Sequence, residues 1–182
     1  MIDRSEASEA LADINDMVQR VRQSRIYDLA SRLMTMWGVL VFAGYLVTWV
    51  VPRYAFYAWT AVYVVGIAGW AAISTINRRQ SGVSTFGAKF LFAFALLFAF
   101  GVFCCVMGQF GPRQISVFWP VYFMMLYSIA GLWFGYAFIA IGLAVSVLAL
   151  VGYVYAGNAF DLWMAFVNGG GLILGGLWMR RV

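Results

Sequence analysis

The most polar residue within an apolar segment of the sequence is Asn168, which is followed directly by Gly169, Gly170 and Gly171. Three successive glycines could interrupt a helix and free backbone carbonyl groups. Interrupted helices of this kind line substrate and ion sites in transporters. This pattern predicts a small neutral ligand site around Asn168 as one interpretation of the segment.

The same residues could instead serve helix packing. Gly171 and Gly175 have the GxxxG spacing, and glycines allow two helices to approach closely in a membrane. Asn168 would then hydrogen-bond to a neighbouring helix, with Tyr127 or Tyr122 as candidate partners. The sequence leaves both interpretations open.

A second group of reactive side chains is rich in sulfur. Cys104 and Cys105 are adjacent, Met107 follows, and Met124 and Met125 lie in the next apolar segment. Soft sulfur ligands suit copper(I), but methionine also fills gaps in apolar cores, and the chain contains 9 of them. Neighbouring cysteines make neither a CxxC motif nor a disulfide framework. We therefore expect no metal and no cofactor.

Catalytic chemistry has little to build on. The chain has no histidine, which removes the usual zinc ligand and general base. Between Lys89 and Arg180 the charged residues are Arg113 and Asp161, both near the ends of apolar segments. Intramembrane charges usually mark proton relays and ion paths. We expect a protein that is not an enzyme and, with no basic–aromatic pattern, does not bind nucleic acid.

Composition places the chain in a membrane. Hydrophobic residues make up 64% of the 182 residues and charged residues 10%, against about 45–50% and about 25% in soluble domains. A soluble core could not bury that much apolar surface, so the lipid bilayer must be a partner. The predicted fold class is an all-α polytopic membrane protein.

A bilayer core of about 30 Å needs about 20 helical residues to cross it. The apolar segments predict six transmembrane helices, near residues 33–51, 55–76, 88–109, 115–133, 136–156 and 160–179. The fourth and fifth would be antiparallel neighbours, because a short link at Phe134 and Gly135 joins them. Pro120 would lie in the first turn of the fourth helix, where proline is tolerated.

Three similar hairpins are predicted within these six spans. In each hairpin a loop residue precedes a tryptophan by seven positions (Pro52 and Trp59, Pro112 and Trp119, Ala156 and Trp163). Each unit contains two spans, so all three would have the same orientation in the membrane.

Basic residues predict the orientation, since cytoplasmic loops are enriched in Lys and Arg. With both termini cytoplasmic, the outer side carries Arg53 and Arg113, and every other basic residue lies inside (Arg4, Arg20, Arg22, Arg25, Arg32, Arg78, Arg79, Lys89, Arg180, Arg181). We predict a multi-pass protein of the bacterial inner membrane.

Residues 1–32 predict an amphipathic helix on the cytoplasmic side, outside the hydrocarbon, with residues 33–182 forming the transmembrane domain. Its apolar residues recur at spacings of three and four and share one face (Leu11, Ile14, Val18, Val21). Acidic residues fill the first half and arginines the second (Arg20, Arg22, Arg25). This face could contact a protein partner through residues 5–32, or lie on anionic headgroups.

The hairpin layout, with Trp37 and Gly38 opening the first span and Pro52 at the first turn, resembles small six-span bacterial inner-membrane proteins of the acid-resistance HdeD type. The arginine-tipped C-terminus also looks like that of uncharacterised proteobacterial membrane proteins. The resemblance covers the spans and implies no functional residues. The charged N-terminal helix departs from it.

Two functions follow as hypotheses. The first is a non-enzymatic protein acting through helix–helix contacts, as an accessory or regulatory subunit or as a homo-oligomer. The alternative is a small-solute binding or transport subunit with a neutral pocket near Asn168, because six short-looped spans also resemble the substrate-binding subunits of vitamin uptake systems.

Overall fold

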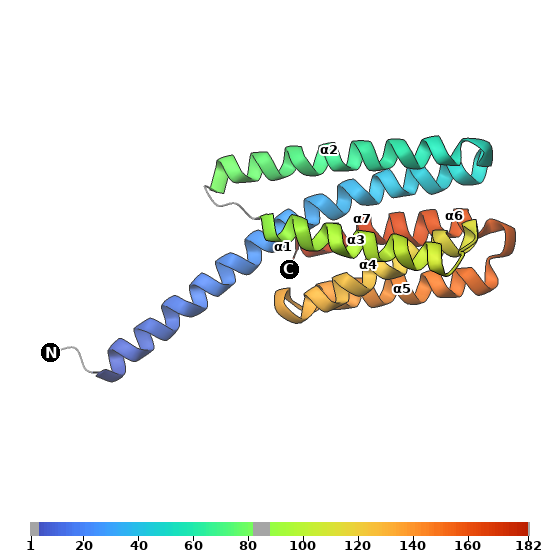
Figure 1. The fold of residues 1–182 in the computed structure, drawn as a ribbon. Coiled ribbons are helices and arrows are strands. Elements are labelled where there is room, and N and C mark those ends of the chain that lie inside the picture. The colour runs from blue at the N-terminus through green and yellow to red at the C-terminus, as the bar shows by residue number, and fades with distance from the viewer. Residues whose placement is uncertain (1–3, 82–87, 182) are drawn as a thin grey trace.

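The computed structural model describes residues 4–81 and 88–181, and within these ranges the chain is helical and contains no strand (Figure 1). This confirms the all-helical class. The elements in chain order are α1 (Arg4–Val50), η1 (Pro52–Tyr54), α2 (Ala55–Ser81), α3 (Ala88–Met107), α4 (Pro112–Phe134), α5 (Tyr136–Tyr155), η2 (Gly157–Ala159), α6 (Phe160–Met164), η3 (Ala165–Gly170) and α7 (Gly171–Met179).

Five helical segments are long and apolar enough to cross a membrane: Ser24–Val50, Pro52–Asn77, Pro112–Phe134, Tyr136–Tyr155 and Gly157–Met179. The helix α3 has a shorter apolar stretch, Phe92–Met107. Large apolar side chains remain exposed along all of these elements, and lipid can solvate them where water would not. The chain is a multi-pass helical membrane protein.

The first helix runs without a break from Arg4 to Val50, so the expected N-terminal helix and the expected first span form one element. Residues 4–37 contain no glycine or proline, the residues that most often kink helices. In Figure 1 the N-terminal part of α1 leaves the bundle and projects beyond it. We call residues 4–23, which precede the apolar part of α1, the α1 extension.

Four spans form the core of the bundle: α1, α4, α5 and the last span, which consists of α6, η3 and α7. Two buried apolar clusters each draw on all four. One lies at the end of the bundle where the apolar part of α1 begins at Ser24 and α7 ends at Met179, which we call the inner end. The other lies at the opposite end, near the turns at Pro52 and Gly157, which we call the outer end.

The helices α2 and α3 pack on the outside of this core, α2 mainly against α1 and α3 against α4. In both pairs a tryptophan ring lies over a glycine of the preceding helix, Trp59 over Gly44 and Trp119 over Gly101. Trp163 of α6 lies over Gly152 of α5 in the same way. Trp119 and Trp163 occupy space that a Cβ on the facing glycine would need, whereas Trp59 lies at an ordinary contact distance of 3.6 Å from a Cβ on Gly44.

The start of α4 corrects the expected position of Pro120. The helix begins at Pro112, so the proline in its first turn is Pro112 and not Pro120. The side chain of Gln114 accepts a hydrogen bond of 2.7 Å from the Gly111 N–H. Proline suits the first helical position because its missing N–H has no partner there in any case. Because α4 begins three residues earlier than expected, Pro120 lies in the helix interior.

Packing of the core predicts a difference between two methionines. Met164 is fully buried in the outer cluster, whereas Met125 is 49% exposed. Met164→Ala should lower the free energy of unfolding by about 2–5 kcal/mol, because it leaves a cavity, and Met125→Ala by well under half as much. Unfolding in mixed detergent micelles measures both, and similar losses would contradict this account of the core.

Candidate functional site

The buried cluster at the outer end contains a hydroxyl that replaces a donor missing from α4. Pro120 has no N–H, so the carbonyl oxygen of Ser116, four residues earlier, lacks its normal partner within α4. The Tyr45 hydroxyl of α1 donates a hydrogen bond of 2.7 Å to this oxygen. The Tyr45 side chain is 2% exposed, and inside a membrane such a carbonyl must be satisfied by the protein.

Asn168 faces the same hydroxyl from the last span. It lies in η3, a π-helical segment between α6 and α7, and segments of this kind are frequent at functional sites. Asn168 is 6% exposed, and its side chain lies close enough to the Tyr45 hydroxyl to interact with it. Tyr45 thus links α1, α4 and η3.

The two tyrosines expected beside Asn168 have other partners. The Tyr122 hydroxyl donates to the carbonyl oxygen of Leu97 in α3, at 2.8 Å. Tyr127 packs on the inner cluster, with its ring 5.8 Å from that of Phe138. Sequence reasoning missed Tyr45, although a proline in the interior of α4 is a signal that some donor must reach Ser116.

The glycines after Asn168 differ in what surrounds them. A Cβ on Gly169 would lie 2.6 Å from the Cα of Phe42 in α1, so the two backbones are in direct contact. Nothing lies within 4 Å of the corresponding position on Gly170. Gly171 faces Val145 of α5, and Gly175 faces Ile141 of α5 and Met34 of α1.

Further along, the last span stays in contact with α1. Gly38 of α1 lies against the backbone of Gly169 and Ile173. Ser31 donates a hydrogen bond to the carbonyl oxygen of Gly176, and Arg180 donates through Nε to Ser31, at 3.0 Å. The last span therefore packs closely against α1 from Gly169 to Arg180.

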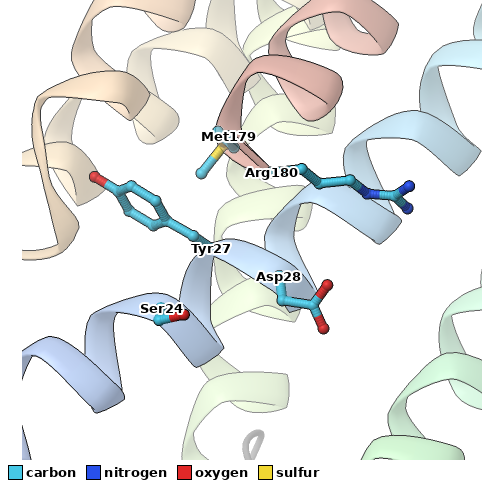
Figure 2. Close-up of a pocket in the computed structure, with 5 residues that line it drawn as sticks. All are labelled: Ser24, Tyr27, Asp28, Met179 and Arg180. Carbon is cyan, nitrogen blue, oxygen red and sulfur yellow. The ribbon is translucent and has the colours of Figure 1, made fainter. Parts of the chain in front are cut away.

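Two surface cavities lie at opposite ends of the bundle, away from Asn168. One of about 290 Å³ lies at the inner end between α1 and α7 (Figure 2). The other, of about 130 Å³, lies at the outer end beside Trp163. Asn168 lines neither of them.

Arg113 and Asp161 lie at the outer end of the bundle, near the starts of α4 and α6. Arg113 donates a hydrogen bond of 2.9 Å to the carbonyl oxygen of Tyr153, and its guanidinium lies over the rings of Tyr153 and Phe160. Asp161 lies near enough to Arg113 and to Tyr45 to interact electrostatically with both. In the described ranges, Arg113 and Asp161 do not form an ion pair.

The sulfur-containing residues are dispersed. Cys104 and Cys105 are half-buried free thiols on α3, and Met107 is exposed. Met124 is buried in the inner cluster, and Met125 is exposed on the next residue of α4. Within residues 4–81 and 88–181, no three His, Cys, Asp or Glu side chains come together in a metal-binding group.

The α1 extension carries an exposed apolar stripe. Leu11 is 62% exposed, Ile14 56%, Met17 65% and Val21 56%. Arg25, one turn further on, is exposed as well. The side chains of Val18, Arg20 and Arg22 lie outside the part of the structure that can be described. An exposed apolar stripe of this kind is a candidate contact surface.

Comparisons with known proteins find no match for the chain among protein-family models, curated proteins or solved structures.

A double-mutant cycle tests the role of Tyr45. Tyr45→Phe should cost about 1–3 kcal/mol in the free energy of unfolding, since it leaves the Ser116 carbonyl buried without a donor. In a Pro120→Ala background the restored N–H can bond to that carbonyl, so the same substitution should cost clearly less. Unfolding in mixed micelles measures the free energy of unfolding of the unsubstituted chain, the two single variants and the double variant. Equal costs in the two backgrounds would disprove the link to Pro120.

Adjacent glycines provide a matched pair for the α1 contact. Gly169→Ala should destabilise the bundle by about 1–3 kcal/mol, because the new methyl group meets the Phe42 backbone. Gly170→Ala should change the stability by less than about 0.5 kcal/mol, because the space beside it is open. Thermal unfolding in one detergent compares the two variants, and equal melting temperatures would contradict the close approach of α1 and η3.

Proposed function

We propose that this chain is a non-enzymatic accessory or regulatory subunit of the bacterial inner membrane, and that its α1 extension binds a helix of a cytoplasmic protein. The observation that carries the proposal is the exposed apolar stripe of Leu11, Ile14, Met17 and Val21. This stripe lies on a helix that continues directly into the bundle.

Continuity of α1 favours a protein partner over the lipid surface. A helix that lies on headgroups must turn sharply where it joins a transmembrane span. Sharp kinks arise at proline, at glycine or at a π-bulge, and residues 4–37 contain no glycine or proline. The α1 extension instead projects beyond the bundle (Figure 1), which supports a position of its apolar stripe away from the bilayer.

Charge order favours a different protein over a second copy. Copies in one membrane share an orientation, so two α1 extensions would run parallel. The acidic halves would then lie side by side, as would the arginine-rich halves, and like charges at facing positions are unfavourable. The matching partner is an amphipathic helix with the opposite charge order, basic beside Glu6, Glu9, Asp13 and Asp16 and acidic beside Arg20, Arg22 and Arg25.

The proposed membrane layout has six spans in three hairpins, with both termini cytoplasmic. Support comes from the three tryptophans near the outer turns. Trp59, Trp119 and Trp163 each lie over a glycine of the first helix of their own hairpin, so the contact recurs where the sequence repeats. The positive-inside rule supports the orientation, since the arginines at both ends of the chain then lie in the cytoplasm.

Site-specific photocrosslinking in cells tests the contact. A photoreactive residue at Ile14 should give a defined protein adduct, and the same residue at Ala12, on the opposite face of the helix, should give little. Ile14→Asp should abolish copurification of the adduct partner without changing the melting temperature, while Ala12→Glu should leave copurification intact.

The identity of the cross-linked protein shows what binds the α1 extension. A partner helix of opposite charge order supports the proposal, and exchanging its acidic and basic residues together with those of the α1 extension should restore a contact that either exchange alone abolishes. An adduct with the mass of two copies of this chain, or equal labelling at Ala12 and Ile14, would contradict it.

Cysteine labelling tests the layout. In a Cys104→Ala, Cys105→Ala background, Asn158→Cys should react with a membrane-impermeant maleimide in intact cells. Ala12→Cys and Arg181→Cys should react only after the membrane is opened, because an even number of spans places both on the cytoplasmic side. Labelling of Arg181→Cys in intact cells would refute the six-span layout.

A further inference from the structure

The inner cavity is built by two spans that are far apart in the sequence. Ser24, Tyr27 and Asp28 line it from α1, and Met179 and Arg180 line it from the end of α7. In Figure 2 the charged groups of Asp28 and Arg180 extend to the same side of the cavity, and Tyr27 extends to the other side. The cavity, of about 290 Å³, can hold a small polar group.

The position of the cavity corresponds to a bilayer interface. The apolar part of α1 begins at Ser24 and that of the last span ends at Met179, so the cavity lies at the level where both leave the hydrocarbon. Aromatic residues mark the same level: the rings of Tyr136 and Trp178 lie 6.1 Å apart and both are exposed. Tyrosine and tryptophan are enriched at the depth of lipid headgroups.

Arg180 is held ready for an acceptor. Its Nε donates to the Ser31 hydroxyl, which in turn donates to the carbonyl oxygen of Gly176. Among the described residues, nothing accepts a hydrogen bond from its two Nη groups. A guanidinium fixed through Nε presents these Nη donors to a phosphate oxygen in a preset geometry.

The acidic residue of the cavity is already neutralised. Arg32, one turn further along α1, forms an ion pair of 2.8 Å with Asp28 and a second contact of 3.3 Å. Arg180 therefore leaves a net positive charge at the cavity. Arg25 and Arg181, next to Ser24 and Arg180 in the sequence, are exposed and add to it. Arginines near a membrane surface attract anionic lipids.

We infer that this cavity binds the phosphate group of a phospholipid from the leaflet at the inner end, the cytoplasmic leaflet in the proposed orientation. The Nη groups of Arg180 donate to the phosphate oxygens, and the Ser24 hydroxyl supplies a further donor from α1. Met179 and Tyr27, both buried, form the apolar side. This site does not depend on the α1 extension having a protein partner.

Native mass spectrometry of the full chain in a neutral detergent tests the inference. Dioleoyl-phosphatidylglycerol should form a one-to-one adduct at least ten-fold more readily than dioleoylglycerol, which has the same acyl chains without the phosphate. Arg180→Gln should reduce the adduct at least five-fold. Arg79→Gln, which removes an exposed arginine near the C-terminal end of α2, should leave the amount of adduct unchanged.

Two further arms complete the test. Ser24→Phe fills the cavity without touching the contact between Arg180 and Ser31, so its adduct should also fall, with an unchanged melting temperature showing that the chain still folds. Competition with millimolar inorganic phosphate separates the two sources of phosphate. An undisplaced lipid adduct supports a lipid site, and displacement supports a site for free phosphate of the same chemistry.

Other results would overturn the inference. Equal adduct formation by dioleoylglycerol and by the phospholipid would show that the protein recognises the acyl chains and not the phosphate. An unchanged adduct in both folded variants, Arg180→Gln and Ser24→Phe, would place the lipid elsewhere on the protein.

Discussion

Inside lipid, each backbone carbonyl must find its donor within the protein, and Tyr45 lies where this requirement is hardest to meet. Pro120 removes a donor from α4, and the π-helical segment η3 departs from regular α-helical bonding a short distance away. One buried hydroxyl from α1 reaches the Ser116 carbonyl and the Asn168 side chain. Tyr45 thereby joins α1, which is a continuous helix, to the proline-containing part of α4 and to η3.

The glycines complete this arrangement by allowing α1 to approach. Gly38 and Gly169 bring the backbones of α1 and the last span into contact, and Gly176 does the same beside Ser31. Without side chains at these positions, dispersion contacts extend along the whole interface, and van der Waals packing is the main attraction between helices in lipid. The polar contacts at Tyr45 and at Ser31 then fix the register.

Sequence alone could establish the class of protein, because composition and the lengths of the apolar segments depend on little beyond the bilayer. The same reasoning places Asn168 within an apolar segment and leaves open whether it binds a ligand or packs against a neighbouring helix. Its partner does not, because Tyr45 is more than a hundred residues away and only the packing of α1 brings them together. The continuity of α1 could not be predicted either. The change in hydropathy near residue 32 indicates a boundary between two helices, but the backbone continues as one helix.

The unbroken length of α1 gives the molecule a mechanical property. The α1 extension is about 30 Å long at 1.5 Å per residue, and no glycine or proline lies between it and Trp37. About its contact with the last span at Gly38, α1 has a long arm, residues 4–37, and a short arm, residues 39–50. A displacement of the α1 extension would therefore be carried along one continuous helix toward this contact and toward Tyr45 beyond it.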